Sequence, residues 1–471
     1  GGRLQLDTAS PTLAVSGSYT KVSAGQSFSA VINDQAQLFM WGLNNSWQLG
    51  VNDVVNRSSP VQVSGSWTSV AASASGSQTL GIKSDGTMYG WGNNAGGQLM
   101  VNDAAGRSNP TQVYGGGSWV AVTTASNITF AIRSDLGLYG AGQNDAGLIG
   151  DLGTNSTINR STPTLIQSQL TSSTSPVNLF GSWSQATAGL SFTMGVTAPS
   201  SLGYAWGLNS LGQLATNDTV DRSSPQQVSS GTSWTALYAG SATGYGRTSD
   251  NNLYAWGLGT TGQTSGFNLP ISRSNIYQIG NNFISVNMSR PHQIGVASWQ
   301  QISAGVSFNV GTRSGALYAW GLNAAGQVGD NTTINRSSPT LIASGSYTSV
   351  SAGFDHSVAI STSNSVAYTW GNNVAGQLGL NDTLSRSAPV FFGQAASYTY
   401  NITDQSLNSI TLTRTGTTYS QTVIPFAGTV AVDFSTVSDY ITVTGNTVFE
   451  LGVTAPSDFT LECFIYPRTF T

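Results

Sequence analysis

Short runs of alternating apolar and polar residues, separated by turn residues, cover most of this chain. A typical stretch runs from Gln78 to Ser84, turns at Asp85-Gly86, and continues from Thr87 to Trp91. Alternation with a period of two predicts half-buried strands. The Asp-Gly step predicts a tight hairpin, because glycine supplies the positive φ that such a turn needs. No useful length of sequence shows a helical period, so the pattern predicts an all-β protein.

The strand pattern is organised by a repeat whose first landmark is the dipeptide Trp-Gly. Six such dipeptides and one degenerate copy, Ala141-Gly142, make seven units. An Arg-Ser step follows every copy, with proline three residues after the arginine except in the fifth unit, where Ile276 stands. Two landmarks in register through seven units identify a repeat array. The structural repeat residues are Trp41, Trp91, Trp206, Trp256, Trp320 and Trp370 with Arg57, Arg107, Arg160, Arg222, Arg273, Arg336 and Arg386.

Each unit offers about four strands, which is the content of one β-propeller blade. We therefore expect residues 1–395 to form a seven-bladed ring. Ser10 to Thr20 closely repeats Ser338 to Thr348, so the chain begins inside a unit. One terminal strand, Thr12–Val15 or Val390–Phe392, is then expected to complete a blade begun at the other end, which would remove an exposed sheet edge.

The unit resembles a known repeat. Val-Ser-Ala-Gly, a hairpin, the segment from Leu317 to Gly329 and then Arg-Ser-Ser-Pro are similar to the repeat of the regulator of chromosome condensation family, whose members are seven-bladed propellers. The resemblance covers roughly residues 10–392. It implies nucleotide exchange on a small nuclear GTPase together with chromatin attachment. In that family a histidine commonly follows the Ala-Gly pair, and only His356 keeps it, whereas Phe28, Phe192 and Phe308 take its place, which favours a buried packing role.

The repeat stops after Phe392. Residues 396–427 read as a β-rich connector, and residues 428–471 resemble the opening strands of laminin-G-like, concanavalin-type sandwich domains. Such jelly-roll domains are longer, so we expect only the N-terminal part of one here. With a first residue that is Gly and not Met, this favours a segment of a longer polypeptide.

Charge is scarce. Charged residues make up 8% of the chain and the net charge is −4, where about 25% charged residues is typical. Without a basic run, nucleic-acid binding is not expected. One cysteine, Cys463, and two distant histidines, His292 and His356, offer no metal or catalytic cluster. No apolar run is long enough for a membrane span. The sequence therefore predicts a protein without catalytic residues, metal or cofactor.

Acidic residues accompany the repeated arginines. In four units an aspartate precedes the arginine by four residues, and these pairs are expected to order a long loop. They are Asp53 with Arg57, Asp103 with Arg107, Asp218 with Arg222, and Asp382 with Arg386.

Specificity is expected where the units differ. The connection after the third unit is lengthened by residues 168–177, and the one after the fifth by residues 279–296. Trp47 stands where most sister units have glycine; it could face a ligand or pad a neighbouring blade. The candidate recognition residues are Trp47, Phe283, Arg290 and His292.

A propeller with a lectin-like sandwich and few charges resembles modular surface proteins of bacteriophages and bacteria. This favours a non-enzymatic structural or adhesion protein, such as a virion appendage, tail fibre or capsid decoration, that binds other virion or surface proteins or host-surface glycan. Its expected location is the virion or the cell exterior, and self-association stays open. The alternatives are a secreted or cell-surface bacterial adhesin and a guanine nucleotide exchange factor. Fold alone does not decide among them.

Overall fold

The computed structural model describes residues 18–144, 158–166, 182–229, 232–259, 288–294, 298–362 and 365–392, with five short strands nearer the chain ends. The chain divides into two compact units. One is Gly17–Phe392, and the other combines Gly1–Ser16 with Gly393–Thr471.

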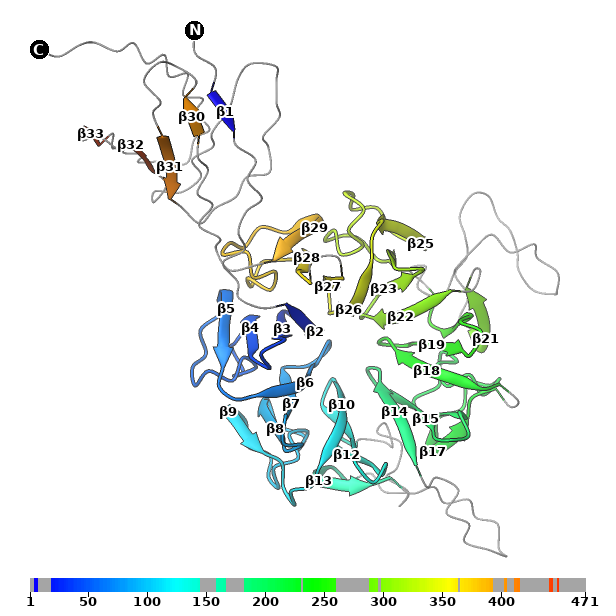
Figure 1. Ribbon diagram of the computed structural model, residues 1–471. Helices are drawn as coiled ribbons and strands as arrows, with labels where there is room; N and C mark the ends of the chain where they lie inside the picture. The colour runs from blue at the N-terminus through cyan, green and yellow to red at the C-terminus, as the bar shows by residue number, and fades with distance from the viewer. Residues whose placement is uncertain are drawn as a thin grey trace, which may run out of the picture. The chain divides into compact units, whose positions relative to one another are not determined.

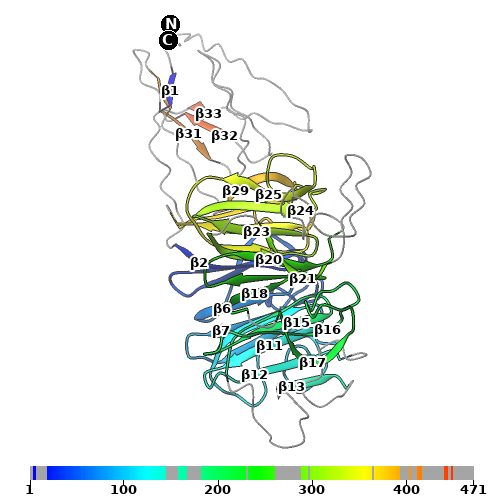
Figure 2. The same ribbon diagram turned by 90° about the vertical axis from the view of Figure 1, so that its right-hand side faces the viewer.

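The first unit is a ring of seven four-stranded antiparallel sheets, which confirms the predicted seven-bladed β-propeller (Figure 1). Figure 2 shows the same blades from the side. The blades, in order, are β2 (Tyr19–Ala24), β3 (Phe28–Asn33), β4 (Leu38–Gly42) and β5 (Arg57–Val63); β6 (Trp67–Ala72), β7 (Gln78–Lys83), β8 (Met88–Gly92) and β9 (Arg107–Gln112); β10 (Trp119–Ala125), β11 (Ile128–Arg133), β12 (Leu138–Gly142) and β13 (Arg160–Leu165); β14 (Trp183–Ala188), β15 (Phe192–Thr197), β16 (Gly203–Gly207) and β17 (Arg222–Gln227); β18 (Trp234–Ala239), β19 (Thr243–Thr248), β20 (Leu253–Gly257) and β21 (Met288–Ile294); β22 (Trp299–Ala304), β23 (Phe308–Arg313), β24 (Ala316–Gly321) and β25 (Arg336–Ala343); β26 (Tyr347–Ala352), β27 (His356–Ser361), β28 (Ala367–Gly371) and β29 (Arg386–Phe392).

The ring closes differently from the sequence prediction. Each of the seven sheets consists of four consecutive strands, and Val390–Phe392 belongs to β29, in the blade that begins at Tyr347. The expectation that this segment completes a blade begun at the other end is therefore wrong, while Thr12–Val15 lies outside the described residues. Hydrogen bonds join the last blade to the first instead: the Ala24 N–H donates to Ser351 Oγ at 2.8 Å, and the Asn381 N–H donates to the Ser58 carbonyl at 2.8 Å.

Strand register explains why Trp-Gly and Arg-Ser recur together. In the first blade Gly42 pairs with Phe28 on one side and with Arg57 on the other. Gly42 has φ +102°, and an added Cβ would lie 2.5 Å from the Ser27 carbonyl oxygen, so only glycine fits there. The glycine of the Trp-Gly step faces the arginine that starts the fourth strand in five further blades: Gly92 and Arg107, Gly142 and Arg160, Gly207 and Arg222, Gly321 and Arg336, Gly371 and Arg386.

The fifth blade corrects the sequence reading. Gly257 pairs with Met288, not with Arg273, which lies outside the described residues. The fourth strand is Met288–Ile294, in which the buried Ile294 pairs with Leu253. Register here follows burial, because shifting a strand by one residue exposes its apolar face. The extra length therefore lies inside the fifth blade, between β20 and β21, and deleting residues 279–296 would remove the fourth strand of that blade.

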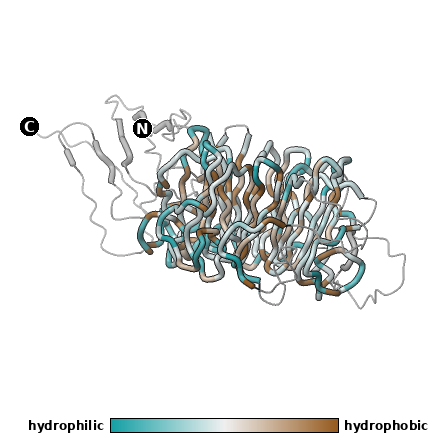
Figure 3. Tube along the Cα trace, turned by 90° about the horizontal axis from the view of Figure 1, so that it is seen from below, coloured by the Kyte–Doolittle hydropathy of each residue, from teal (hydrophilic) through white to brown (hydrophobic). Residues whose placement is uncertain are grey.

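Tryptophans hold neighbouring blades together. Apolar residues of the first blade, such as Phe28 and Met40, form one cluster with Trp67 and Trp91 of the second. The Trp91 indole N–H also donates to the Gln48 carbonyl of the first blade at 3.0 Å. The same bond joins Trp256 to Gln213, Trp370 to Gln327 and, across the ring closure, Trp41 to Gln377. Figure 3 shows apolar segments running through the body of the ring, as expected for a core between blades.

One blade interface carries a compensating exchange. Gly50 and Gly329 lie against the indoles of Trp91 and Trp370, where an added Cβ would be 2.8 and 2.6 Å from the ring. The third blade has Ala141 instead of tryptophan, and the second blade has Met100 instead of that glycine. Met100 is buried in one cluster with Ala141. The methionine therefore fills the space that the missing indole leaves.

This exchange predicts strong coupling. Met100→Gly opens a cavity and should destabilise the protein by about 2–5 kcal/mol, less any relief of the positive φ at that residue. Ala141→Trp overpacks the site and should cost about 1–3 kcal/mol. The double variant recreates the sister interfaces, so its free energy of unfolding in urea should fall by clearly less than the losses of the two single variants added together. Simple additivity would show that Met100 does not occupy the place of the indole.

The second unit contains a five-stranded sheet in the order β1 (Leu4–Leu6), β30 (Ile402–Asp404), β31 (Thr411–Thr415), β32 (Tyr440–Val443) and β33 (Thr447–Val448). Leu4 pairs with Asp404, so both ends of the chain contribute to one sheet. The connector over residues 396–427 and the partial sandwich over residues 428–471 stay predictions.

Candidate functional site

The long loop between the third and fourth strands of a blade is built around a buried asparagine. In the first blade Asn44 Oδ1 accepts the Leu49 N–H at 3.0 Å, while Asn44 Nδ2 donates to both the carbonyl and the carboxylate of Asp53 at 2.9 Å. One amide thus ties both halves of the loop together. Equivalent bonds are made by Asn94, Asn209, Asn323 and Asn373.

The expected aspartate–arginine pairs complete the loop. Asp53 accepts the Val55 N–H at 2.9 Å and the Arg57 guanidinium at 2.5 Å, and Arg57 also donates to the Val55 carbonyl at 2.8 Å. The Val55 N–H and then Arg57 lower the pKa of the Asp53 carboxyl. The other three pairs, each at 2.6 Å, are Asp103 with Arg107, Asp218 with Arg222, and Asp382 with Arg386, and the sixth blade pairs Arg336 with Asp330 instead.

In four blades, the first, second, sixth and seventh, the loop is also hydrogen-bonded to the next blade of the ring. The Asn52 N–H donates to the Ser108 carbonyl at 3.0 Å, and Ser108 Oγ donates to Asn52 Oδ1 at 3.0 Å. The backbone bond recurs from Asn102 to Ser161 and from Asn331 to Ser387. These bonds make the loops fixed parts of the ring, which suits them to presenting side chains in defined positions.

Trp47 lies in the loop of the first blade and is 39% exposed, whereas the other described tryptophans are buried. Its ring covers Gly106 of the next blade, where an added Cβ would lie 2.8 Å from the indole. Sister blades carry Asn56, Asn159 or Asp221 at the place of Gly106. Trp47 and Gly106 are thus a matched pair. One part of the indole packs on Gly106 of the neighbouring blade, and the rest of the side chain is exposed to solvent.

Replacing Trp47 with Gly should change stability little. Trp47 has φ +62°, and the equivalent Gly97, Gly212 and Gly326 share this left-handed backbone. The lost packing on Gly106 is therefore offset by relief of backbone strain, and we expect a change within about 1 kcal/mol by thermal unfolding. A loss as large as that of a buried tryptophan would mean that Trp47 is a core residue.

Arg290 and His292, the other candidate recognition residues on described strands, do not lie beside Trp47. Phe283 lies outside the described residues, as does the lengthened connection over residues 168–177. Arg290 and His292 lie on β21, where His292 pairs in register with Ala255. Trp47 belongs to the first blade and β21 to the fifth, and these blades are not neighbours in the ring. Trp47, Arg290 and His292 therefore do not make one site.

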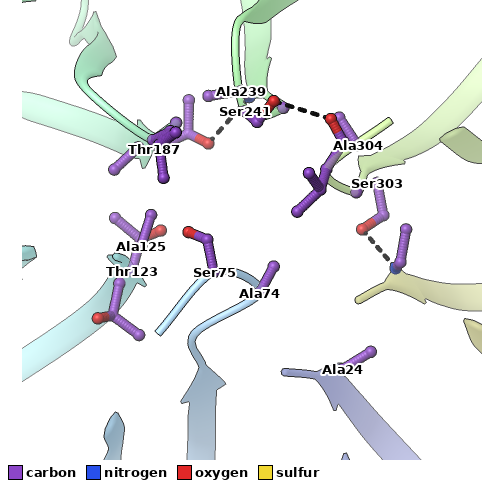
Figure 4. Close-up of a pocket in the computed structure, with 18 of the residues that line it drawn as sticks. Ala24, Ala74, Ser75, Thr123, Ala125, Thr187, Ala239, Ser241, Ser303 and Ala304 are labelled. Carbon is purple, nitrogen blue, oxygen red and sulfur yellow. Dashed lines mark hydrogen bonds between the residues drawn. The ribbon is translucent and has the colours of Figure 1, made fainter. Parts of the chain in front are cut away.

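A central pocket of about 150 Å³ is lined by small residues at the ends of the innermost strands (Figure 4). Its hydroxyls bond to neighbouring blades: Ser303 Oγ accepts the Ala352 N–H at 2.9 Å, Thr187 Oγ1 accepts the Ala239 N–H at 3.2 Å, and Ser241 Oγ donates to the Val306 carbonyl at 2.8 Å. The repeated Ser-Ala-Gly step was the available signal for this pocket. Its lining has no charged or nucleophilic group other than hydroxyls, which favours a structural channel.

His356 sits in an arrangement that superficially resembles a catalytic triad. Its Nε2 lies 2.8 Å from Ser29 Oγ, and its Nδ1 lies 3.9 Å from Asp355 Oδ1. The Gln377 carbonyl, 2.9 Å from Ser29 Oγ, only accepts, and with the Ser29 proton directed to it Nε2 is the donor to Ser29 Oγ and not a base toward it. Both side chains are fully buried, and burial lowers the pKa of His356 to about 4. The packing role predicted for this position agrees with this geometry.

Two further findings concern the described residues alone. They contain no group of three or more His, Cys, Asp or Glu side chains that could hold a metal ion. Among these same residues, no helix has the length and apolar character to cross a membrane.

Residues 35–80, 204–242 and 314–360 match the family Regulator of chromosome condensation (RCC1) repeat, and residues 347–377 match a second form of it. The Ultraviolet-B receptor UVR8 of Arabidopsis thaliana is 28% identical over 186 residues, which is 38% of this chain and 39% of that receptor. Two solved structures are similar. Human WBSCR16 aligns with a TM-score of 0.63 at 17% identity, covering 76% of this chain and 94% of that protein. Prp20p from Saccharomyces cerevisiae aligns with a TM-score of 0.62 at 19% identity, covering 81% of this chain and 88% of that protein. The chain carries RCC1 repeats on a seven-bladed propeller.

Proposed function

We propose that this protein is a non-enzymatic binding propeller of the RCC1 type, in which a fixed ring presents loops to another macromolecule. The observation that carries the proposal is the repeated loop between the third and fourth strands. A buried asparagine, an aspartate–arginine pair and bonds to the next blade hold it in place. Such construction suits recognition, because a preorganised loop loses little conformational entropy on binding.

The comparisons support an RCC1-type role more than the virion role that composition favoured. The similar structure of Prp20p was described with its binding to Gsp1p and histones. A comparable partner, and nucleotide exchange on a small GTPase, would be the finer form of this proposal. Surface adhesion, on a virion or a cell, is the second candidate, and the observation that favours it is the 8% of charged residues.

Two assays separate these candidates. Faster release of a fluorescent guanine nucleotide from a loaded small GTPase would support exchange, and retention on an array of surface glycans would support adhesion. A chain ending at Gln394 should retain binding if the ring carries it. Turnover of chromogenic ester, glycoside or phosphate substrates by the purified protein would contradict a non-enzymatic role.

A further inference from the structure

Aliphatic side chains point into solvent at one repeated position, two residues before the loop arginine. Single exposed apolar side chains are common, but exposure at the same position in five blades is not expected of residues scattered by chance. The exposed fractions are 58% for Val55, 62% for Ile158, 58% for Val220, 63% for Ile334 and 65% for Leu384. We call these five residues the aliphatic set.

The aliphatic set lies on one face of the ring. Phe28, Gly42 and Arg57 are cross-strand neighbours, so the hairpin before Phe28 and the loop before Arg57 leave the same end of the blade. The other blades repeat this arrangement, and we call this end the loop face. Exposed Leu190 and Phe354, from hairpins between first and second strands, lie on it as well.

Backbone bonds hold the aliphatic set away from the core. The Val220 N–H donates to Asp218 Oδ1 at 3.1 Å, and the Val220 carbonyl accepts from Arg222 at 2.8 Å. Leu384 has the same two partners in Asp382 and Arg386, at 3.0 and 2.6 Å. The side chains therefore stand out from ordered backbone, and a partner would not have to order the loops first.

Charge on the loops is cancelled locally. In the loops of Val55, Val220, Ile334 and Leu384 the aspartate and the arginine bond to each other, as Asp218 does to Arg222 at 2.6 Å. Apart from the exposed Asp221, the charges of these four loops are held in pairs. A strongly charged partner would therefore find little net charge to complement, whereas an uncharged apolar surface would bury the aliphatic set without stripping water from unpaired ions.

We propose that the loop face docks a protein partner through uncharged, apolar contact residues, with the aliphatic set as its anchors. This rests on the proposed binding function and adds its location and the chemistry of the partner.

The second blade supplies a natural control for the test. Ala105 occupies the position of the aliphatic set, and its loop keeps the same bonds: the Ala105 N–H to Asp103 at 2.9 Å, and Arg107 to the Ala105 carbonyl at 2.6 Å. A chain carrying Val55→Ala, Val220→Ala, Ile334→Ala and Leu384→Ala should therefore fold as the parent does, which its thermal melting would verify.

The probe is a random peptide library selected on the parent protein. We expect the selected peptides to be rich in Leu, Ile, Val and Phe and to carry no net charge. Their Kd should rise at least about tenfold for the four-alanine chain and change less than about twofold when salt rises to high ionic strength. The matched control, Tyr114→Ala with Val120→Ala and Leu341→Ala, removes exposed side chains away from the loop face and should leave Kd unchanged.

Several outcomes would overturn the inference. Peptides that still bind the four-alanine chain, or that are charged and released by salt, would show that binding occurs elsewhere or by another chemistry, while the binding function itself would stand. Concentration-dependent self-association that disappears in the four-alanine chain would make the loop face an interface between copies. Failure to select any peptide would count against both the inference and the proposed function.

Discussion

Replacing Trp256 with Ala is expected to lower the free energy of unfolding by about 3–5 kcal/mol. Trp256 is fully buried in a cluster that joins the fourth and fifth blades, and its indole N–H donates to the Gln213 carbonyl at 2.9 Å. Truncation removes apolar contacts from two blades and leaves a buried acceptor unsatisfied. Because each blade packs only on its neighbours, this interface has no other element to replace the loss. Urea unfolding followed by tryptophan fluorescence measures the effect.

Arg222→Ala is the matched control for Trp256→Ala. Arg222 belongs to the same part of the ring, but it and its partner Asp218 are partly exposed, with side-chain exposures of 25% and 36%. A solvated pair of this kind contributes about 0–1 kcal/mol. Similar losses for the two variants would contradict the assignment of the Trp-Gly tryptophans to the blade interfaces.

The sequence predicted the ring because its strongest landmarks are residues that the backbone requires. Gly42 and its equivalents have positive φ and lie against the start of the second strand, so neither the glycine nor its register can drift. Seven occurrences of such a constraint give the number of blades. The tryptophan before six of these glycines marks the core, since it fills the space against the preceding blade, and Ala141 stands in the seventh place.

The fifth blade shows where this reasoning fails. Arg273-Ser274 matched the landmark by identity, but the strand begins at Met288, where Pro291 and Ile294 occupy the places that Pro60 and Val63 hold in the first blade. Burial of Ile294 decides the register, and burial is a property of the folded ring. Arg290 and His292 consequently lie on a blade strand, not in an inserted loop.

The candidate site was harder to predict than the fold. Trp47 departs from the repeat, and the sequence left open whether it pads a blade or meets a ligand; its contact with Gly106 depends on a neighbouring blade and cannot be read along one unit. The aliphatic set is visible as Val, Ile or Leu before the arginine. Only the fold shows that these side chains are exposed together, because in a strand the same residues would be buried.

Acidification between pH 6.5 and pH 4 is expected to destabilise the ring through His356. Burial lowers the pKa of His356 from 6.5 to about 4. In this range the unfolded chain binds a proton at this residue and the folded chain does not. The contribution of His356 to the free energy of unfolding is therefore fully present above pH 6.5 and is lost as the pH falls toward 4. The loss should be about 3 kcal/mol, since one pKa unit corresponds to about 1.4 kcal/mol.

The neighbouring carboxyl groups act at lower pH or in the opposite direction. Burial raises the pKa of Asp355, so protonation of Asp355 in the folded chain offsets part of the loss toward the acidic end of the range. The pKa values of Asp53 and Asp103 are lowered in the folded chain, so the stability that these carboxylates contribute is lost only as the pH falls below the usual aspartate pKa. The slope between pH 6.5 and pH 5 therefore reports mainly on His356.

His356→Phe isolates the effect of the imidazole, because Phe28, Phe192 and Phe308 occupy the same position in other blades and pack against the equivalent glycines. The variant should fold at pH 7, and Ser29 keeps its bond to the Gln377 carbonyl. Its urea midpoint should be nearly independent of pH between 6.5 and 5, while that of the parent falls. His292 is present in both proteins, so any contribution it makes cancels in the difference. If the urea midpoints of the two proteins fall in parallel as the pH falls, protonation of His356 is not what destabilises the ring where its last and first blades meet.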